Sequence, residues 1–243
     1  MEKNEFKIDI EEMMRLGVHF GHKTSRCHSK MKPYILGIRN DVHIIDLQKT
    51  KEKLEEALRF IQKIISEQKT IVFIGTKIIL KNLVKEIALE CNLPYISERW
   101  LGGTFTNFET ISKRIKYLKD LEKKEKEGFF EKYTKKEKQQ FKKELERLRK
   151  KFEGIRNLEK LPDAIFICDM GKESTAIKEA KKKEIKIIAI ADTNVDLTLA
   201  DIAIPASDDG ISSVRYILEK VKEVILRTKS EIPNPKSETN PKS

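Results

Sequence analysis

Four carboxylates follow apolar runs of the kind that form buried strands, and they are the residues best placed to do chemistry. Asp169 and Asp192 each end such a run, and Asp208 and Asp209 follow a third. Ligands of open α/β sheets bind beyond the carboxyl ends of the strands, and clustered oxygens suit Mg²⁺. Asp192, Asp208 and Asp209 are therefore candidate metal ligands. The commoner role of such an aspartate is to cap the next helix, and we expect that role here.

Lys77 also follows an apolar run, in the sequence GTK at 75–77. An enzyme or sensor that binds a nucleotide at the strand ends would use these groups, and this is the alternative function. The run is not a P-loop, because the upstream glycine of GxxxxGK[ST] is missing, and the chain contains no GxGxxG. No nucleophile with its base can be assembled from the sequence. We predict a protein that is not an enzyme, has no small-molecule substrate and needs no cofactor, except Mg²⁺ held by RNA or by the aspartates.

A zinc site is the second chemistry to consider, at His19, His22, Cys27 and His28. The spacing HxxHx₄CH matches no common structural zinc pattern. All four histidines of the chain lie between His19 and His43, in a basic and aromatic stretch. A histidine in such a stretch more often contacts phosphate, a base or the core than performs catalysis.

The stretch 15–39 has no acidic residue, although the chain as a whole is rich in glutamate. Aromatic and histidine rings are interleaved with its cations. Cations without nearby carboxylates suit the phosphate backbone of RNA, and rings suit its bases. The RNA contacts predicted in this stretch are Arg15, His19, His22, Lys23, Arg26, Lys30, Lys32 and Arg39.

A second candidate contact surface is the run 97–108, which holds the only tryptophan and a Gly-Gly pair. The glycines allow close approach of a partner, and Arg99 and Trp100 offer a charged fork beside a flat ring. The alternative is structural, with Trp100 packed at the base of the helical segment that follows. With the flanking positions and the strand end at 75–77, the further predicted RNA contacts are Lys77, Arg99, Trp100, Asn107, Lys113 and Arg114.

The elements that position these residues alternate between strand and helix patterns. Buried strands are expected near 70–74, 94–96, 162–168, 187–191 and 202–205. This alternation predicts a parallel sheet with helices on both faces. Before it, Asp9 is expected to cap a short helix, segments 34–38 and 42–45 to be extended, and Thr50 to cap a longer helix.

A helical hairpin is expected to interrupt the sheet. Apolar residues recur at heptad spacing before and after Gly128, which predicts two antiparallel coiled-coil helices. Residues 109–156 hold 18 Lys/Arg and 10 Asp/Glu, a surplus of 8. The expected organisation is a discontinuous α/β RNA-binding body at 1–108 and 155–228, a hairpin at 109–154 and a disordered tail at 229–243.

The composition points to a polyanionic partner. The chain has 243 residues and a net charge of +11, a surplus that favours nucleic acid, although a lysine-rich genome could produce it too. The three cysteines are odd in number and far apart, which indicates a reducing compartment. No apolar run could span a bilayer, and the acidic N-terminus argues against a targeting peptide.

Several runs together resemble the bacterial-type small-subunit ribosomal protein two family. The first is LGVHFGHKT at 16–24, and the others, in order, are MKPYI at 31–35, VHIIDL at 42–47, GTK at 75–77, RWLGG at 99–103, LPD at 161–163 and DTN at 192–194. The resemblance covers about residues 9–226. The chain departs from the pattern at Ile78, where a basic residue is usual, at Leu197, where proline is usual, and at 184–186.

This resemblance implies a flavodoxin-like α/β domain with a projecting coiled-coil hairpin. It implies a structural, RNA-binding role on the small ribosomal subunit, near the head–body junction, without catalysis. The implied partners are small-subunit rRNA and neighbouring ribosomal proteins, including the large one that recruits messenger RNA in bacteria. The implied location is the ribosome of the bacterial cytoplasm, with an organelle stroma or matrix as the alternative.

Overall fold

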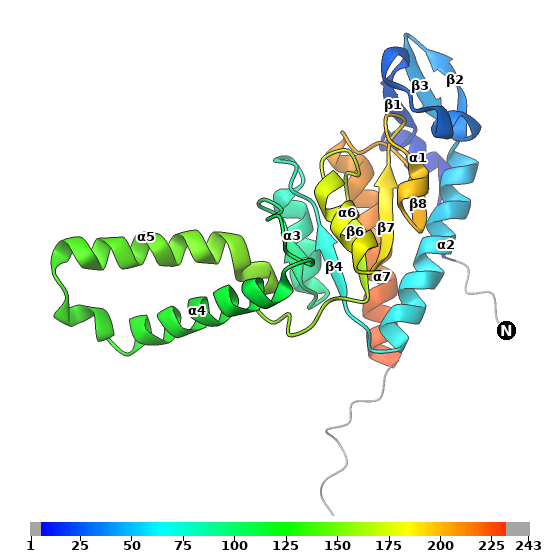
Figure 1. The fold of residues 1–243 in the computed structure, drawn as a ribbon. Helices are drawn as coiled ribbons and strands as arrows, with labels where there is room; N and C mark the ends of the chain where they lie inside the picture. Colours follow the sequence, from blue (N-terminus) through cyan, green and yellow to red (C-terminus); the bar gives the residue numbers. More distant parts are fainter. Residues whose placement is uncertain (1–5, 232–243) are drawn as a thin grey trace, which may run out of the picture.

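In the computed structural model, which describes residues 6–231, five apolar segments form one parallel sheet (Figure 1). The strands are β4 (Ile71–Ile74), β5 (Tyr95–Ile96), β6 (Ala164–Ile167), β7 (Lys186–Ala191) and β8 (Ile202–Pro205), in the order β5-β4-β6-β7-β8. Both faces of such a sheet are covered, so nearly every strand residue must be apolar. β4 and β6 are indeed buried throughout.

Helices cover the two faces through alternate strand residues. Phe73 contributes to the core beneath α1 (Ile10–Arg15), α2 (Leu47–Ser66), α3 (Lys81–Glu90) and α7 (Ile211–Glu231). Val72 and Ile74 contribute to the opposite core, with α6 (Ser174–Lys182) and the hairpin. A short 3-10 turn, η5 (Leu197–Leu199), connects β7 to β8. The predicted fold class, a parallel sheet with helices on both faces, is confirmed.

Residues 15–45 form a small domain, here called the N-terminal module, over the carboxyl end of the sheet (Figure 1). Its strands β1 (Phe20–Lys23), β3 (Val42–Ile45) and β2 (Ile35–Arg39) lie in that order and pair antiparallel. The 3-10 turns η1 (Thr24–Arg26) and η2 (Ser29–Tyr34) connect β1 to β2. Asn40 and Asp41 both have positive φ, as a tight two-residue hairpin turn requires. The sequence predicted the two later strands but not β1.

Helix α2 begins earlier than the sequence suggested. Asp46 is its N-cap, and its carboxylate accepts a hydrogen bond from the backbone of Gln48. Thr50, expected to be the cap, is buried inside the helix and its hydroxyl donates to the carbonyl of Pro205 at 2.6 Å. The expectation was wrong because Thr50 faces the end of β8, so its hydroxyl serves tertiary packing.

The inserted hairpin consists of α4 (Phe108–Lys126) and α5 (Lys135–Phe152), with η3 (Phe129–Lys132) between them and η4 (Glu153–Ile155) after α5. It projects from the β5 side of the sheet (Figure 1). A capping box of Thr134 and Glu137 starts α5. The apolar stripes face each other and continue without a break into the core over the sheet, through Trp100 and Phe105. The hairpin is therefore packed onto the body at its base.

At the C-terminal end, α7 runs to Glu231. Residues 229–231, which the sequence analysis assigned to the tail, are therefore helical, because the apolar face of α7 still packs through Thr228. The rest of the expected tail, 232–243, and residues 1–5 lie outside the described residues.

Candidate nucleic-acid interface

Five cations of the N-terminal module are exposed and form no ion pair within residues 6–231. Within residues 6–231, no carboxylate lies within 4.0 Å of the charged groups of Lys23, Arg26, Lys30, Lys32 or Arg39. Arg15 forms one exposed ion pair, with its guanidinium 3.6 Å from Glu11. Exposed cations without local partners are free to neutralise an external polyanion.

Packing beneath the module explains why these cations face outward. Met31, between Lys30 and Lys32, is completely buried and anchors η2 to the core. The backbone N–H of His28 donates to the carbonyl of Thr193 at 2.8 Å. Because the intervening residues are fixed to the sheet, the lysines on either side of Met31 are held at the surface.

Of the predicted RNA contacts at the hairpin base, some side chains are exposed and others already bind groups within the protein. Arg99, Asn107 and Arg114 are exposed. Lys113 is exposed but its ammonium group lies 2.6 Å from Glu109. The segment after β5 and helix α4, which carry these residues, lie on the β5 side of the sheet, away from the N-terminal module (Figure 1). The structure therefore does not join the two predicted sets into one surface.

Trp100 is not available at the surface. It is 9% exposed, it packs edge-on against Phe105 and its indole N–H donates to Glu179 at 3.1 Å. A direct RNA contact by this ring conflicts with its burial. The alternative considered from the sequence, a tryptophan packed at the hairpin base, fits the geometry.

Glu179, on α6, holds the central part of the 97–108 loop, from Trp100 to Thr106. Its carboxylate also accepts hydrogen bonds from the backbone N–H groups of Gly103, Phe105 and Thr106, at 2.8–3.2 Å. Burial alone would raise the pKa of Glu179, but these backbone hydrogen bonds, together with that from Trp100, outweigh it and lower the pKa. Sequence reasoning missed Glu179, because nothing distinguishes it from the other glutamates of a Lys/Glu-rich chain.

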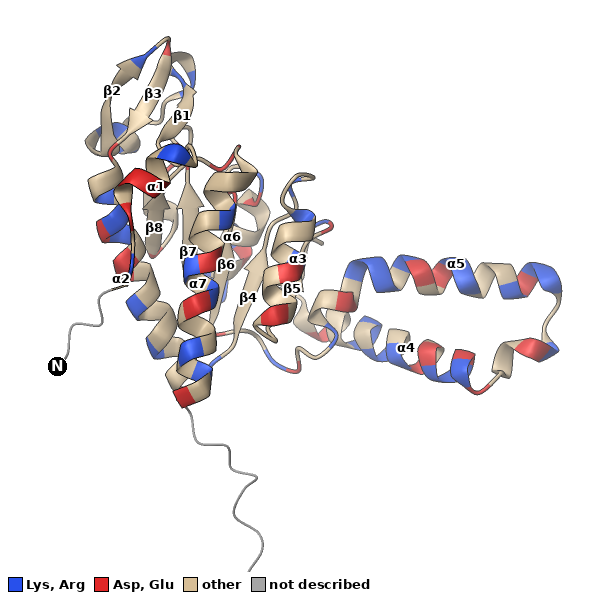
Figure 2. Cartoon of the chain, turned by 180° about the vertical axis from the view of Figure 1, so that it is seen from behind, with Lys and Arg blue, Asp and Glu red and all other residues tan. Residues whose placement is uncertain are grey.

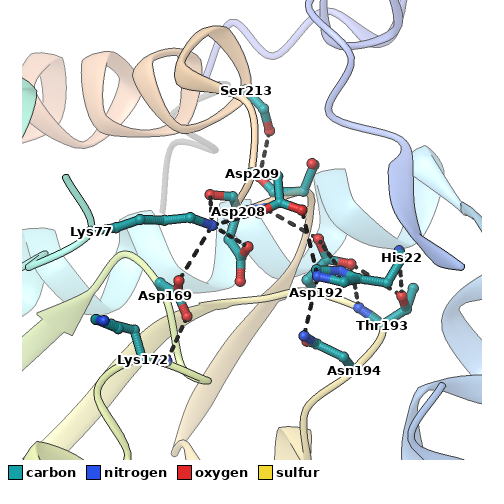
Figure 3. Close-up of polar contacts among 11 residues, drawn as sticks. His22, Lys77, Asp169, Lys172, Asp192, Thr193, Asn194, Asp208, Asp209 and Ser213 are labelled. Atoms are coloured by element: carbon teal, nitrogen blue, oxygen red, sulfur yellow. Dashed lines mark hydrogen bonds and ion pairs between the residues drawn. The ribbon is translucent and has the colours of Figure 1, made fainter. Parts of the chain in front are cut away.

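Three of the four aspartates at the strand ends gather around Lys77 (Figure 3). The Lys77 ammonium lies 3.4 Å from Asp169, 3.1 Å from Asp208 and 2.6 Å from Asp209. Burial alone would lower the pKa of Lys77, but the hydrogen bond to Asp209 and the charge of Asp208 raise it. Burial, together with the charges of Asp169 and Asp192, raises the pKa of Asp208 to about 7.

Two expectations are corrected by this cluster. The carboxylates of Asp208 and Asp209 bond to Lys77, and Asp169 accepts from the backbone of Lys172 before α6 begins, so they do not cap the following helices. Lys77 was a predicted RNA contact, but its charge is already committed to three carboxylates. Both corrections have one cause. The fold brings Lys77 next to the aspartates that follow β8, which are far from it in the sequence.

His22 extends the cluster toward the N-terminal module. Its ring lies 3.1 Å from Asp192 and 3.5 Å from Asp209, and its backbone N–H donates to the hydroxyl of Thr193. The contact with Asp192 raises the pKa of His22. His22 therefore fastens the module to the sheet and is not free for RNA.

The other zinc candidates do not join His22. Burial, together with the charge of Arg39, lowers the pKa of His19, whose ring lies tilted against that of Phe20. The Nδ1 of His28 accepts from the backbone of Lys30. In the described part of the chain, the groups able to share a metal are His22, Asp192 and Asp209. The HxxHx₄CH set considered from the sequence is therefore not assembled.

The sheet and its attachments define a class of protein. In chain order the strands run 2-1-3-4-5, the flavodoxin-like doubly wound arrangement. A helical hairpin is inserted after the edge strand, and a module with unpaired cations sits over the strand ends. This is an α/β protein whose candidate interface is a charged surface.

The chain belongs to the family described as Ribosomal protein S2, whose model matches residues 13–228. The resemblance seen in the sequence motifs is thereby confirmed. Membership makes the chain a structural ribosomal protein of the small subunit. Among the helices of residues 6–231, none combines the length and apolar character needed to span a membrane.

Proposed function

We propose that the protein holds small-subunit rRNA chiefly through the cations of its N-terminal module. The observation that supports this is the absence of any carboxylate within ion-pair distance of Lys23, Arg26, Lys30, Lys32 and Arg39 among residues 6–231. Each phosphate neutralised by a cation releases counterions, which contributes affinity that falls with salt. The fixed position of η2 holds two of these cations, Lys30 and Lys32, ready for such contacts.

The hairpin has a second, weaker role in this proposal. Acidic side chains already pair with several of its cations, as Glu122 does with Arg149 and Arg156. Figure 2 shows both signs interspersed along α4 and α5. We assign the hairpin additional phosphate contacts from its unpaired lysines, and contacts to neighbouring ribosomal proteins.

Exposed apolar side chains of the module favour a protein neighbour there as well. Phe20, Leu36 and Ile38 are 50%, 74% and 62% exposed. Clusters of exposed apolar side chains often mark protein contacts. In a bacterial ribosome, the large protein that recruits messenger RNA is the partner that the sequence resemblance implies, and an organelle ribosome is the alternative setting.

The test compares two matched charge reversals. In the first protein, Arg26, Lys30 and Lys32 are changed together to Glu. In the second, three exposed hairpin lysines that form no ion pair within residues 6–231 are changed to Glu: Lys116, Lys119 and Lys143. We expect the module variant to lose affinity for small-subunit rRNA by at least about tenfold and to flatten the slope of log affinity against log salt by roughly two to three units. The hairpin variant should change less.

Incorporation into subunits is the second readout. The module variant should unfold like the original protein but fail to sediment with small subunits. Normal sedimentation of that variant would overturn the proposal, and a larger defect in the hairpin variant would reverse the assignment of roles.

The alternative, a nucleotide-binding enzyme or sensor at the strand ends, has a specific difficulty. Asp169, Asp192, Asp208 and Asp209 gather where nucleotide phosphates would lie, and they would repel them. Release of a nucleotide on denaturing the purified protein would favour the alternative.

A further inference from the structure

We propose that His22, Asp192 and Asp209 bind one divalent transition-metal ion, with Zn²⁺ as the best match, and that this ion fastens the N-terminal module to the sheet. The ligands come from β1, the end of β7 and the segment after β8 (Figure 3). The inference stands apart from RNA binding, because it rests only on contacts within the chain.

The separations fit a shared ion. One ligand atom from each of the three residues can be chosen so that all lie within 4.8 Å of one another. Zinc bonds of about 2.0–2.2 Å to nitrogen and carboxylate oxygen place tetrahedral ligands roughly 3.3–3.5 Å apart. His22 Nδ1 and Asp192 Oδ2 already lie 3.1 Å apart. Asp209 is exposed, so its carboxylate has room to turn toward the ion.

The ring nitrogen that faces Asp192 points to a missing ligand. His22 Nδ1 is buried but makes no hydrogen bond, although Asp192 Oδ2 lies close by. The two atoms approach each other without the alignment that a hydrogen bond requires. A buried polar atom without an aligned hydrogen bond is costly. An ion between the nitrogen and the carboxylate would satisfy both.

The excess of carboxylates around Lys77 and His22 also favours binding of a cation. Four carboxylates, Asp169, Asp192, Asp208 and Asp209, face one lysine and one histidine. Asp192 and Asp208 are 0% and 2% exposed. Buried charges need compensation, and Lys77 supplies it to Asp169, Asp208 and Asp209. Asp192 forms no ion pair with Lys77, and its partners in the described part of the chain are His22 and the neutral hydrogen-bond donors of Thr193 and Asp208.

The chemical types of the three ligands indicate which metal ion would bind. One imidazole with two carboxylates is a borderline set, which favours Zn²⁺ over Mg²⁺, a cation that prefers oxygen and retains its waters. Thr193 donates its backbone N–H and hydroxyl to Oδ1 of Asp192, and the backbone N–H of Asp208 donates to Oδ2 at 3.4 Å, so Oδ2 keeps one lone pair for the ion. Such outer hydrogen bonds orient ligands in established metal sites.

The experiment titrates Co²⁺, a coloured substitute for Zn²⁺, into the dialysed full-length protein. We expect one equivalent to bind with visible absorption bands, and Zn²⁺ to remove those bands by competition. His22→Gln and Asp209→Asn should each weaken binding at least tenfold. His28→Gln, which changes a histidine of the same module outside the cluster, and Asp169→Asn, which changes a carboxylate on the Lys77 side, should bind as the original protein does.

Asp209 is exposed, so its variant is expected to fold even if the His22 variant does not, and circular dichroism checks both. Bound Zn²⁺ should also slow hydrogen exchange in β1, which a purely adventitious surface ion would not do. No saturable binding, or equal loss in the Asp169 and His28 controls, would overturn the proposal. His22 would then be an imidazolium held between two carboxylates.

Discussion

The N-terminal module and the hairpin are both basic attachments of one sheet, but they carry their charge differently. In the module, five cations are exposed and form no ion pair with any carboxylate of residues 6–231. In the hairpin, Arg149 lies 2.9 Å from both Glu122 and Glu125 across the two helices. Net charge alone ranks the hairpin first, since it has the larger surplus. For binding a polyanion we rank the module first, because carboxylates already pair with several cations of the hairpin.

Their attachments differ as well. The module is joined to the sheet by the buried side chain of Met31 and by polar contacts through His22, His28 and Thr193. The hairpin is joined by a continuous apolar seam and by the five hydrogen bonds that reach the carboxylate of Glu179 from Trp100 and the 103–106 backbone and hydroxyl groups. The exposed cations of each segment and the contacts that attach it to the sheet involve different residues, so each set can be mutated separately.

The largest expected effect on stability is at the hairpin attachment. Glu179→Gln removes a carboxylate that accepts from several buried donors and places an amide N–H₂ against some of them. Unpaired buried donors cost about 1–3 kcal/mol each, so we expect a loss of roughly 3 kcal/mol or more in the free energy of unfolding. Urea unfolding at neutral pH measures it. Glu184→Gln, at an exposed glutamate, is the control.

The same position predicts a pH dependence. The folded-state pKa of Glu179 is lowered, so its stabilisation is complete above the unfolded pKa of about 4.3 and is lost as pH falls through the folded value. Glutamine does not titrate. The difference in unfolding free energy between the original protein and Glu179→Gln should therefore be constant above about pH 5 and shrink below the unfolded pKa. A difference that grows with acidity would contradict this account.

A smaller effect is expected at the module attachment. A Cβ at Gly21 would lie 2.5 Å from Cγ2 and 2.9 Å from Oγ1 of Thr193. Gly21→Ala should therefore cost about 1–3 kcal/mol through overpacking. Gly37→Ala is the matched control, because a Cβ there meets nothing within 4 Å on the same small sheet.

A double-mutant cycle sharpens this prediction. Thr193→Ala removes both clashing atoms, so Gly21→Ala should cost less in that background, by a coupling of about 0.5 kcal/mol or more. Strictly additive losses would mean that Gly21 is not in contact with Thr193 and that the module is attached elsewhere.

The smallest effect on the body is expected from shortening the hairpin. Replacing residues 116–150 with a short Gly/Ser loop keeps Ile111, Ile115, Phe152 and Ile155 at the base. It removes 14 Lys/Arg and 8 Asp/Glu, a surplus of 6. We expect one cooperative unfolding transition with nearly the original midpoint, because closing such a loop costs little. A broad or divided transition in calorimetry would show that the distal hairpin supports the sheet.

Several features of this protein could be predicted from local pattern. The buried strands near 164–167 and 187–191 are apolar throughout, and the heptad stripes of the hairpin recur at fixed spacing. Both signals depend only on neighbours in the chain. The acid-free stretch 15–39 was visible for the same reason, because it is a matter of composition.

The tertiary structure decided which polar groups meet. His22 and Thr193 lie 171 positions apart in the chain, and Lys77 lies 131 positions from Asp208. Nothing near Lys77 indicated that carboxylates would occupy its charge, and nothing near Trp100 indicated that Glu179 would hold its ring in the core. Polar pairing depends on the three-dimensional juxtaposition of distant segments, which leaves no periodic trace in the sequence. The helices and strands could therefore be predicted from the sequence, but the polar contacts at the ends of the strands could not.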